Sequence, residues 1–226
     1  MNFKPSTFLR IVVIILLSLT AAMTLLGAIG TTCVAFNAEK YGPRMAMLIP
    51  VKPVFQVLVF VSLAAGLFGV YSIVRLARRR RNSYAQILTF LLVGLAASGV
   101  QFYFSLTLRG STAPNNIRLY LTGLTLALLL LLRLPGIWQR TGFDRSGSDG
   151  GLRSAGGAAL FLCGLLTIST PVWAAPTHLI DGSNTSNVLI WPLLTGGAFM
   201  IFLGGIRLAG FKMRVPVKRS MPKQAH

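Results

Sequence analysis

The chain has 226 residues, of which 54% are hydrophobic and only 12% are charged, and its mean hydropathy is +0.68. Soluble globular domains carry about twice as much charge, so this composition excludes an ordinary soluble domain. The net charge of +18 does not indicate nucleic-acid binding, because the basic residues stand beside the ends of apolar runs and form no solvated stripe with aromatic residues. We therefore expect no nucleic-acid partner.

Six apolar runs separated by short loops predict an all-α polytopic transmembrane helix bundle. Each run is close to the roughly 17 to 25 residues that a spanning helix needs. The fourth run reaches that length by continuing to Trp138, because the Arg133 side chain can extend to the headgroups. The first run follows Lys4 and Arg10 as a signal peptide would, but it is too long for a signal h-region, so we expect it to stay uncleaved. The expected spans are 9–29, 54–74, 86–107, 119–138, 157–174 and 188–208.

The distribution of lysine and arginine predicts the orientation of the chain. With six spans, seventeen of the 22 basic residues fall on the side that holds both termini, and five fall on the other side. Because cytoplasmic loops carry the excess of basic residues, we expect both termini in the cytoplasm, with the protein in the plasma membrane. The five residues expected outside are Lys40, Arg44, Lys52, Arg109 and Arg118.

We expect the whole chain, residues 1–226, to form one integral membrane domain, and its sequence contains no detectable internal repeat. The external loop 31–53 contains Pro43, Pro50 and Pro53, which interrupt a long helix, and the apolar segment 45–49 between them is expected at the interface or over the bundle. The cytoplasmic segment 139–156 is rich in glycine, serine and arginine and predicts a flexible linker before a terminal hairpin. A short basic tail, 209–226, is also expected in the cytoplasm.

The acids and histidines all fall in expected loops, which argues against chemistry inside the bilayer. The acids are Glu39, Asp144, Asp149 and Asp181, and the histidines are His178 and His226. Proton pumps and intramembrane metal or haem sites use such groups inside the bundle, and a serine hydrolase needs a base beside its nucleophile. We therefore expect no cofactor, no metal and no enzymatic activity. The alternative is an active site of external-loop groups, drawn from Lys40, Tyr41, His178 and Asp181.

Uncharged polar side chains in the spans are the candidate ligand contacts. Gln56 and Gln101 stand out, because a glutamine amide has two donors and an acceptor oxygen and is seldom left facing lipid. An externally open cavity of roughly 300 Å³ or more would favour a binding site for a neutral or weakly polar molecule. Hydrogen bonding between close-packed helices is the alternative, and it is the simpler expectation. The candidates are Gln56, Gln101, Thr122, Thr125, Thr170 and Thr195.

Small residues in the last span predict close helix packing. They are Gly196, Gly197, Gly204, Gly205 and Ala209, and the last two have the small-xxx-small spacing. Packing within the same bundle is the simpler expectation. The alternative is a homo-oligomer or a membrane-protein partner that packs on this span.

The run RLARRRR directly follows the second span and is the strongest local charge signal. The simpler explanation is that these basic residues fix the orientation of the second span in the membrane. The alternative is docking of anionic lipid headgroups on the cytoplasmic side, at about 1 kcal/mol for each basic residue. The residues concerned are Arg75, Arg78, Arg79, Arg80 and Arg81.

These observations favour a non-catalytic scaffold or accessory subunit of a membrane assembly, because the spans lack acids, contain many small residues and carry no soluble module. The second hypothesis is a small-molecule transport or solute-binding component that uses the polar external half of the spans. A membrane enzyme is the third.

Overall fold

The computed structural model describes residues 7–78, 80, 82–134, 137, 150–174, 179–180, 183–184 and 189–209. Within these residues six helices are long and apolar enough to cross a membrane. This confirms the prediction of an all-α bundle with six spans and supports an integral multi-pass membrane protein. The six are α1 (Thr7–Asn37), α3 (Lys52–Ala77), α4 (Ser83–Arg109), α5 (Asn115–Leu132), α7 (Gly150–Ala174) and α8 (Ile190–Leu208).

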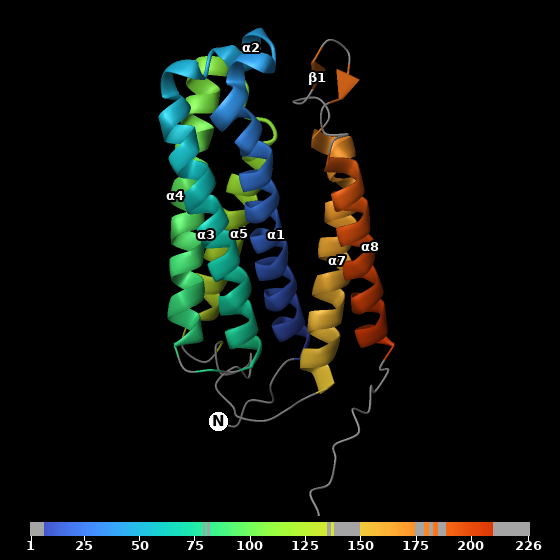
Figure 1. The fold of residues 1–226 in the computed structure, drawn as a ribbon. Coiled ribbons are helices and arrows are strands. Elements are labelled where there is room, and N and C mark those ends of the chain that lie inside the picture. Colours follow the sequence, from blue (N-terminus) through green and yellow to red (C-terminus); the bar gives the residue numbers. More distant parts are fainter. Residues whose placement is uncertain are drawn as a thin grey trace, which may run out of the picture.

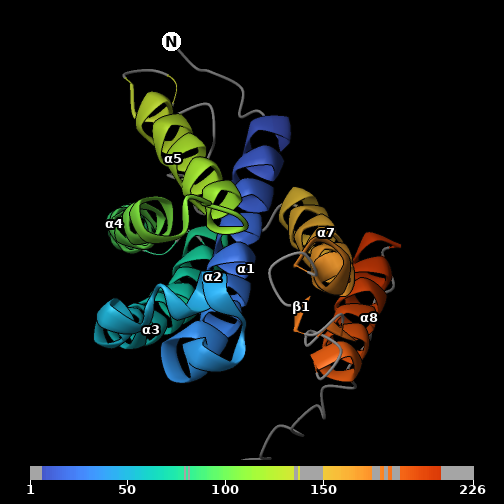
Figure 2. The same cartoon turned by 90° about the horizontal axis from the view of Figure 1, so that it is seen from above.

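Helix α1 holds the central position in the bundle (Figures 1 and 2). It packs against α3, α5 and α7, while α4 packs against α3 and α5, and α8 packs mainly against α7. Seen from above, α1, α3, α4 and α5 form one group, and the α7–α8 hairpin stands on the other side of α1. The hairpin therefore meets the four-helix group mainly through α7 and α1.

Short elements cover one end of the bundle, which we call the α2 end (top of Figure 1). Met45 and Leu48 are 8% and 1% exposed, and they pack in one apolar cluster with Ala35 of α1 and with Phe55 and Val59 of α3. The apolar segment 45–49 therefore closes this end of the four-helix group. The elements here are η1 (Ala38–Lys40), α2 (Pro43–Ala46) and η2 (Ile49–Val51), and between α7 and α8 the antiparallel pair β1 (Leu179–Ile180) and β2 (Ser183–Asn184).

The main apolar core lies toward the opposite end. Leu17, Leu76, Ile87, Phe90 and Leu129 belong to one cluster, and none of them is more than 2% exposed. These side chains come from α1, α3, α4 and α5, so the four helices are closely packed in this half. The α2 end also contains the polar side chains of the candidate site.

Several helix ends differ from the expected span ends. Helix α1 continues past residue 29 to Asn37, and within it the Thr31 and Thr32 hydroxyls donate to the Gly27 and Ala28 carbonyl oxygens at 2.6 and 3.2 Å. Helix α5 covers Asn115–Leu132, four residues earlier at its start than the expected 119, and α7 begins at Gly150 within the segment expected as a linker. Residues 139–149 of that segment and 210–226 of the tail lie outside the described residues.

Glycines bring α7 and α8 close together. A Cβ atom at Gly164 would come 2.6 Å from the Gly197 carbonyl oxygen, and one at Gly204 would come 2.7 Å from the Gly157 carbonyl oxygen. Helix α8 thus packs against α7 through Gly197 and Gly204. Its Gly205 has no neighbour within 4 Å of a Cβ position, so packing of a second chain on that face stays a prediction.

Candidate ligand-binding site

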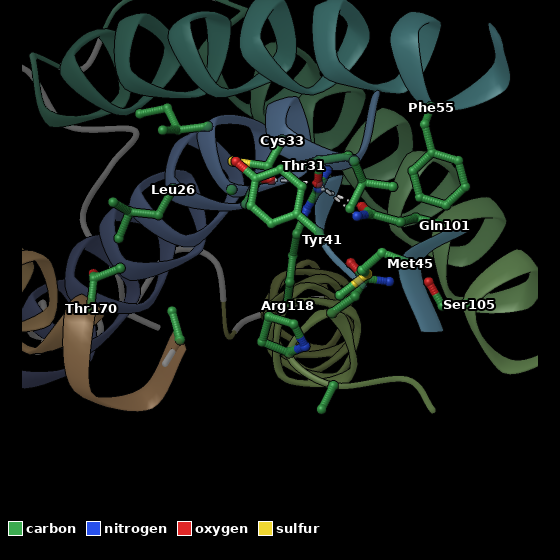
Figure 3. A pocket seen from close by; sticks show the side chains of 18 of the residues that line it. Leu26, Thr31, Cys33, Tyr41, Met45, Phe55, Gln101, Ser105, Arg118 and Thr170 are labelled. Atoms are coloured by element: carbon green, nitrogen blue, oxygen red, sulfur yellow. Dashed lines mark hydrogen bonds between the residues drawn. The ribbon is translucent and has the colours of Figure 1, made fainter. Parts of the chain in front are cut away.

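A cavity lies at the α2 end between the four-helix group and the α7–α8 hairpin (Figure 3). Its volume is about 130 Å³, and its walls come from α1, α3, α4 and α5, from the cap around α2, and from α7 and α8. A cavity of roughly 150 Å³ can hold a benzene-sized molecule, whereas drug-sized ligands occupy about 300 Å³ or more. This cavity therefore has room for a headgroup and not for a complete larger ligand.

Arg118 is a buried charge in the cavity wall. It lies in the first turn of α5 and is 2% exposed. Its Nη2 donates to Ser62 Oγ of α3 at 2.8 Å, and its Nη1 donates to Gln101 Oε1 of α4 at 3.4 Å. Both acceptors are neutral. Glu39, an acid at this end among the described residues, pairs with Lys52 and not with Arg118. The guanidinium is thus buried without a carboxylate among the described residues.

Gln101 connects Arg118 to α1 through a directed hydrogen-bond network (dashed lines in Figure 3). Because a guanidinium can only donate, the Gln101 Oε1 atom accepts from Arg118. The Gln101 Nε2 atom donates to Thr31 Oγ1 at 2.7 Å, and the Thr31 hydroxyl donates in turn to the Gly27 carbonyl oxygen at 2.6 Å. The network joins α5, α4 and α1 and holds Arg118 in place.

Three buried N–H donors belong to residues that line this cavity and have no acceptor. They are Nε of Arg118, Nε of Arg109 and Nε1 of Trp173. The other nitrogens of Arg109 are used, because Nη1 donates to Met45 Sδ at 3.1 Å and Nη2 donates to two carbonyl oxygens after α4 at 3.0 Å. A buried donor without an acceptor costs about 1 to 3 kcal/mol. These three nitrogens have almost no accessible surface, so a molecule with acceptor oxygens would remove part of that cost only where neighbouring side chains move aside.

Apolar side chains form most of the remaining wall, and one side of the cavity is open. Ile29 of α1 and Leu189 before α8 both line it and are 44% and 38% exposed. The cavity is therefore partly open on a side where Ile29 and Leu189 reach the surface of the described part of the chain. Gly30 also lines it, and no atom lies within 4 Å of the position of a Cβ there. The missing side chain of Gly30 thus contributes to the open space.

Tyr41 and Cys33 form a pair at the edge of the cavity. Tyr41 comes from the segment after η1 and Cys33 from α1, and the phenol oxygen points toward the thiol in Figure 3. Hydrogen bonding with Cys33, together with burial, raises the pKa of Tyr41 to about 12. The Tyr41 hydroxyl therefore stays protonated at neutral pH and remains a hydrogen-bond donor.

Two of the six candidate ligand contacts, Gln101 and Thr170, line the cavity. The Thr170 hydroxyl donates to the Leu166 carbonyl oxygen of its own helix at 3.0 Å. Gln56 does not line the cavity. Its Nε2 donates to the Ala35 carbonyl oxygen at 3.1 Å and so joins α3 to α1.

The other three candidates are threonines that do not line the cavity. Thr122 is 1% exposed and donates to the Arg118 carbonyl oxygen at 2.7 Å. Thr125 is 2% exposed and lies 2.9 Å from the Thr20 hydroxyl of α1. Thr195 is exposed on α8 and donates to the Trp191 carbonyl oxygen at 2.8 Å. Thr125 therefore joins two helices, while Thr195 bonds within its own helix.

The described residues of the basic run, Arg75, Arg78 and Arg80, lie at the end of α3 that is opposite to the α2 end. Arg75 donates from Nη1 to the Tyr71 hydroxyl at 3.0 Å, and its guanidinium lies 5.6 Å from the centre of that ring. Arg78 follows the last residue of α3, and Arg80 donates its backbone N–H to the Arg75 carbonyl oxygen at 3.0 Å. Arg79 and Arg81 lie outside the described residues, as do His178 and Asp181. Lipid docking by this run stays a prediction.

The sequence interpretation missed Arg118, Arg109 and Trp173 as a group. It assigned both arginines to the external side, because hydropathy places charges at the ends of apolar runs in water. One signal was present: Arg118, Thr122 and Thr125 have the i, i+4, i+7 spacing of a single helix face. All three are at most 2% exposed, so this polar face points into the bundle.

No family model matches the chain, and neither a curated protein nor a solved structure is significantly similar to it. Among the residues described here, no group of three or more His, Cys, Asp or Glu lies close enough to hold a metal ion. Function is therefore derived from the geometry of the cavity.

Proposed function

We propose that this chain is a solute-binding component of a membrane, with the cavity at the α2 end as its binding site. One observation carries the proposal: three buried N–H donors without acceptors belong to residues that line one open cavity. Buried polar groups in proteins are nearly always hydrogen-bonded. Three of the six buried side-chain polar atoms without a partner among the described residues belong to this one wall, which favours a bound molecule as their partner.

The wall chemistry also supports a binding site. Ligand pockets are mostly apolar, with a few polar groups that fix the orientation of the ligand. Here Leu26, Ile29 and Leu193 supply apolar surface, and Arg118 and Gln101 supply the polar groups. The volume of about 130 Å³ fits the part of a molecule that carries its polar atoms.

A scaffold or accessory subunit is the second candidate. It is favoured by Gln56 and Thr125, which join helices by hydrogen bonds and line no cavity. Hydrogen bonds of this kind stabilise a bundle without any ligand, by roughly 0.6 kcal/mol each.

Filling the cavity tests the proposal. The chain is purified from its native membrane in a mild non-ionic detergent, and everything that stays bound is identified by mass spectrometry. The variant is Gly30→Leu, because Gly30 faces open cavity space. The matched control is Gly99→Leu in α4, where a Cβ also meets no atom within 4 Å but the residue does not line the cavity.

We expect a small molecule to be retained by the unmodified chain and by Gly99→Leu, and to be lost from Gly30→Leu. Equal retention by all three chains would contradict binding in this cavity. Stoichiometric protein partners without any bound small molecule would favour the scaffold.

A further inference from the structure

We propose that the cavity binds the headgroup of an anionic amphiphile, a carboxylate or phosphate monoester whose hydrocarbon chain leaves the cavity between α1 and α8. This inference rests on the proposed function and adds the charge and the shape of the ligand.

The charge follows from the ionisable groups of the wall. Arg118 and Arg109 both line the cavity, and none of the described residues that line it is an aspartate or a glutamate. Arg118 is 2% exposed, so water screens its charge poorly. A buried cation without a counter-ion is costly, and an anionic ligand would supply the counter-ion that the described part of this wall lacks.

The geometry of Arg118 suits an oxyanion. A guanidinium presents Nε and a neighbouring Nη to two oxygens of one carboxylate or phosphate. Nε of Arg118 has no partner, and the contact of Nη1 with Gln101 is long, at 3.4 Å. The Nη atom on the same edge as Nε is Nη2, because Cδ lies on the side of Nη1. An anion at this edge would therefore accept from Nε and share Nη2 with Ser62, which now accepts from Nη2 at 2.8 Å, while Nη1 keeps its contact with Gln101.

The shape of the site separates an amphiphile from a free anion. A volume of about 130 Å³ takes a headgroup and leaves no room for a long chain. The open side is bordered by Ile29 and Leu189, which are large apolar residues. Ile29 lies eight residues before the end of α1 at Asn37, about 12 Å along the helix axis. The opening therefore lies along the apolar part of the helix, where a hydrocarbon chain meets lipid.

Fluorescence of Trp173 reports on binding directly, because Trp173 lines the cavity. The chain has three tryptophans, so Trp138→Phe together with Trp191→Phe leaves Trp173 as the only one. The detergent-purified full chain is stripped of lipid and titrated with decyl phosphate, decanoate, decanol and decyltrimethylammonium. Inorganic phosphate and acetate test the headgroups alone. Thermal unfolding of each variant verifies that it is folded.

We expect decyl phosphate and decanoate to change the Trp173 emission saturably, with at least tenfold higher affinity than decanol, decyltrimethylammonium or the free anions. Arg118→Gln should lower the affinity for decyl phosphate at least tenfold, and Arg118→Lys should lower it less. The matched control is Arg44→Gln, which removes the same charge from an exposed residue at the same end that does not line the cavity. If Arg118→Gln does not fold, Gly30→Leu tests the same site without removing the arginine.

The contrary outcomes are distinct. Equal binding of decanol and decyl phosphate, unchanged in Arg118→Gln, would overturn the anionic headgroup and leave the proposed function standing. Inorganic phosphate binding as tightly as decyl phosphate would overturn the amphiphile. A Trp173 signal that none of the six probes changes would overturn this inference and, if native extracts also yield no bound molecule, the proposed function as well.

Discussion

Gly27 of α1 lies directly against the side chain of Arg118 of α5. A Cβ atom at Gly27 would come 3.2 Å from Cδ and 3.4 Å from Nη1 of Arg118. The absence of a side chain at Gly27 therefore makes room for the guanidinium between the two helices. The Gly27 carbonyl oxygen also accepts a hydrogen bond from the Thr31 hydroxyl, and the Thr31 oxygen accepts one from the Gln101 amide. One glycine thus supports both the position of Arg118 and the network that holds it.

Replacing this glycine should destabilise the bundle through Arg118. We expect Gly27→Leu to lower the free energy of unfolding by about 1 to 3 kcal/mol, because the larger side chain displaces the guanidinium from its acceptors. In an Arg118→Ala background the leucine has free space, so the same substitution should cost much less. Thermal unfolding of the two single variants and the double variant measures this coupling. An equal cost in both backgrounds would show that Gly27 and Arg118 do not interact in this way.

Hydropathy was sufficient to predict the six spans, because each apolar run must satisfy its backbone inside lipid as a helix. It was not sufficient for the helix ends. Thr31 and Thr32 look like loop residues in a hydropathy profile, yet their hydroxyls bond to carbonyl oxygens one turn earlier and α1 continues to Asn37. Such bonds depend on local geometry that average hydropathy does not contain.

The site was harder to predict for a different reason. The amide chemistry of Gln101 predicts an inward position, and the residue does lie in the cavity wall. The sequence places Arg118 outside the bilayer, in water, whereas in the structure its burial depends on Ser62 of α3, 56 residues earlier in the chain, and on the space left by Gly27. Contacts between helices distant in sequence decide whether a charge at a helix start is solvated or buried, and one sequence does not show those contacts.

The α7–α8 interface gives a prediction about two adjacent glycines. A Cβ at Gly197 would come 2.5 Å from Ile168 Cγ1 and 2.8 Å from the Gly164 carbonyl oxygen, whereas a Cβ at Gly196 meets no atom within 4 Å. We expect Gly197→Ala to lower the free energy of unfolding by about 1 to 3 kcal/mol, because the helices must separate. Gly196→Ala should be neutral or stabilising by up to about 1 kcal/mol through helix propensity. The midpoints of thermal unfolding in detergent compare the two, and equal midpoints would contradict the close packing of α8 on α7.

The Tyr41–Cys33 pair predicts a pH dependence in the alkaline range. The pKa of Tyr41 is raised from 10.0 to about 12, first by hydrogen bonding with Cys33 and then by burial. A pKa that is higher in the folded chain than in the unfolded chain means that the protonated phenol stabilises the fold. That contribution is complete below pH 10 and is lost as the pH rises to about 12.

Cys33→Ala removes the larger cause, so the pKa of Tyr41 should fall toward 10 and the loss of stability between pH 10 and 12 should become smaller. Ultraviolet absorbance of tyrosinate follows the titration, and Tyr41→Phe identifies its signal among the five tyrosines. If the titration of Tyr41 is the same with and without the thiol, hydrogen bonding with Cys33 is not the cause of the shift.

The orientation of the bundle decides which leaflet the cavity faces. Of the 22 basic residues, seventeen belong to the side of the termini and five to the other side, so we expect reporter fusions after Arg81 and after His226 to be cytoplasmic. Fusions near Lys40 and Asn184 should be external.

The cavity lies at the end that holds η1 and α2, so this orientation opens it toward the outer leaflet. An external His226 would contradict the orientation and place the opening in the inner leaflet, where anionic lipids are concentrated in many membranes. The cavity and the arginine would be unchanged, but the amphiphile would then come from the cytoplasmic side.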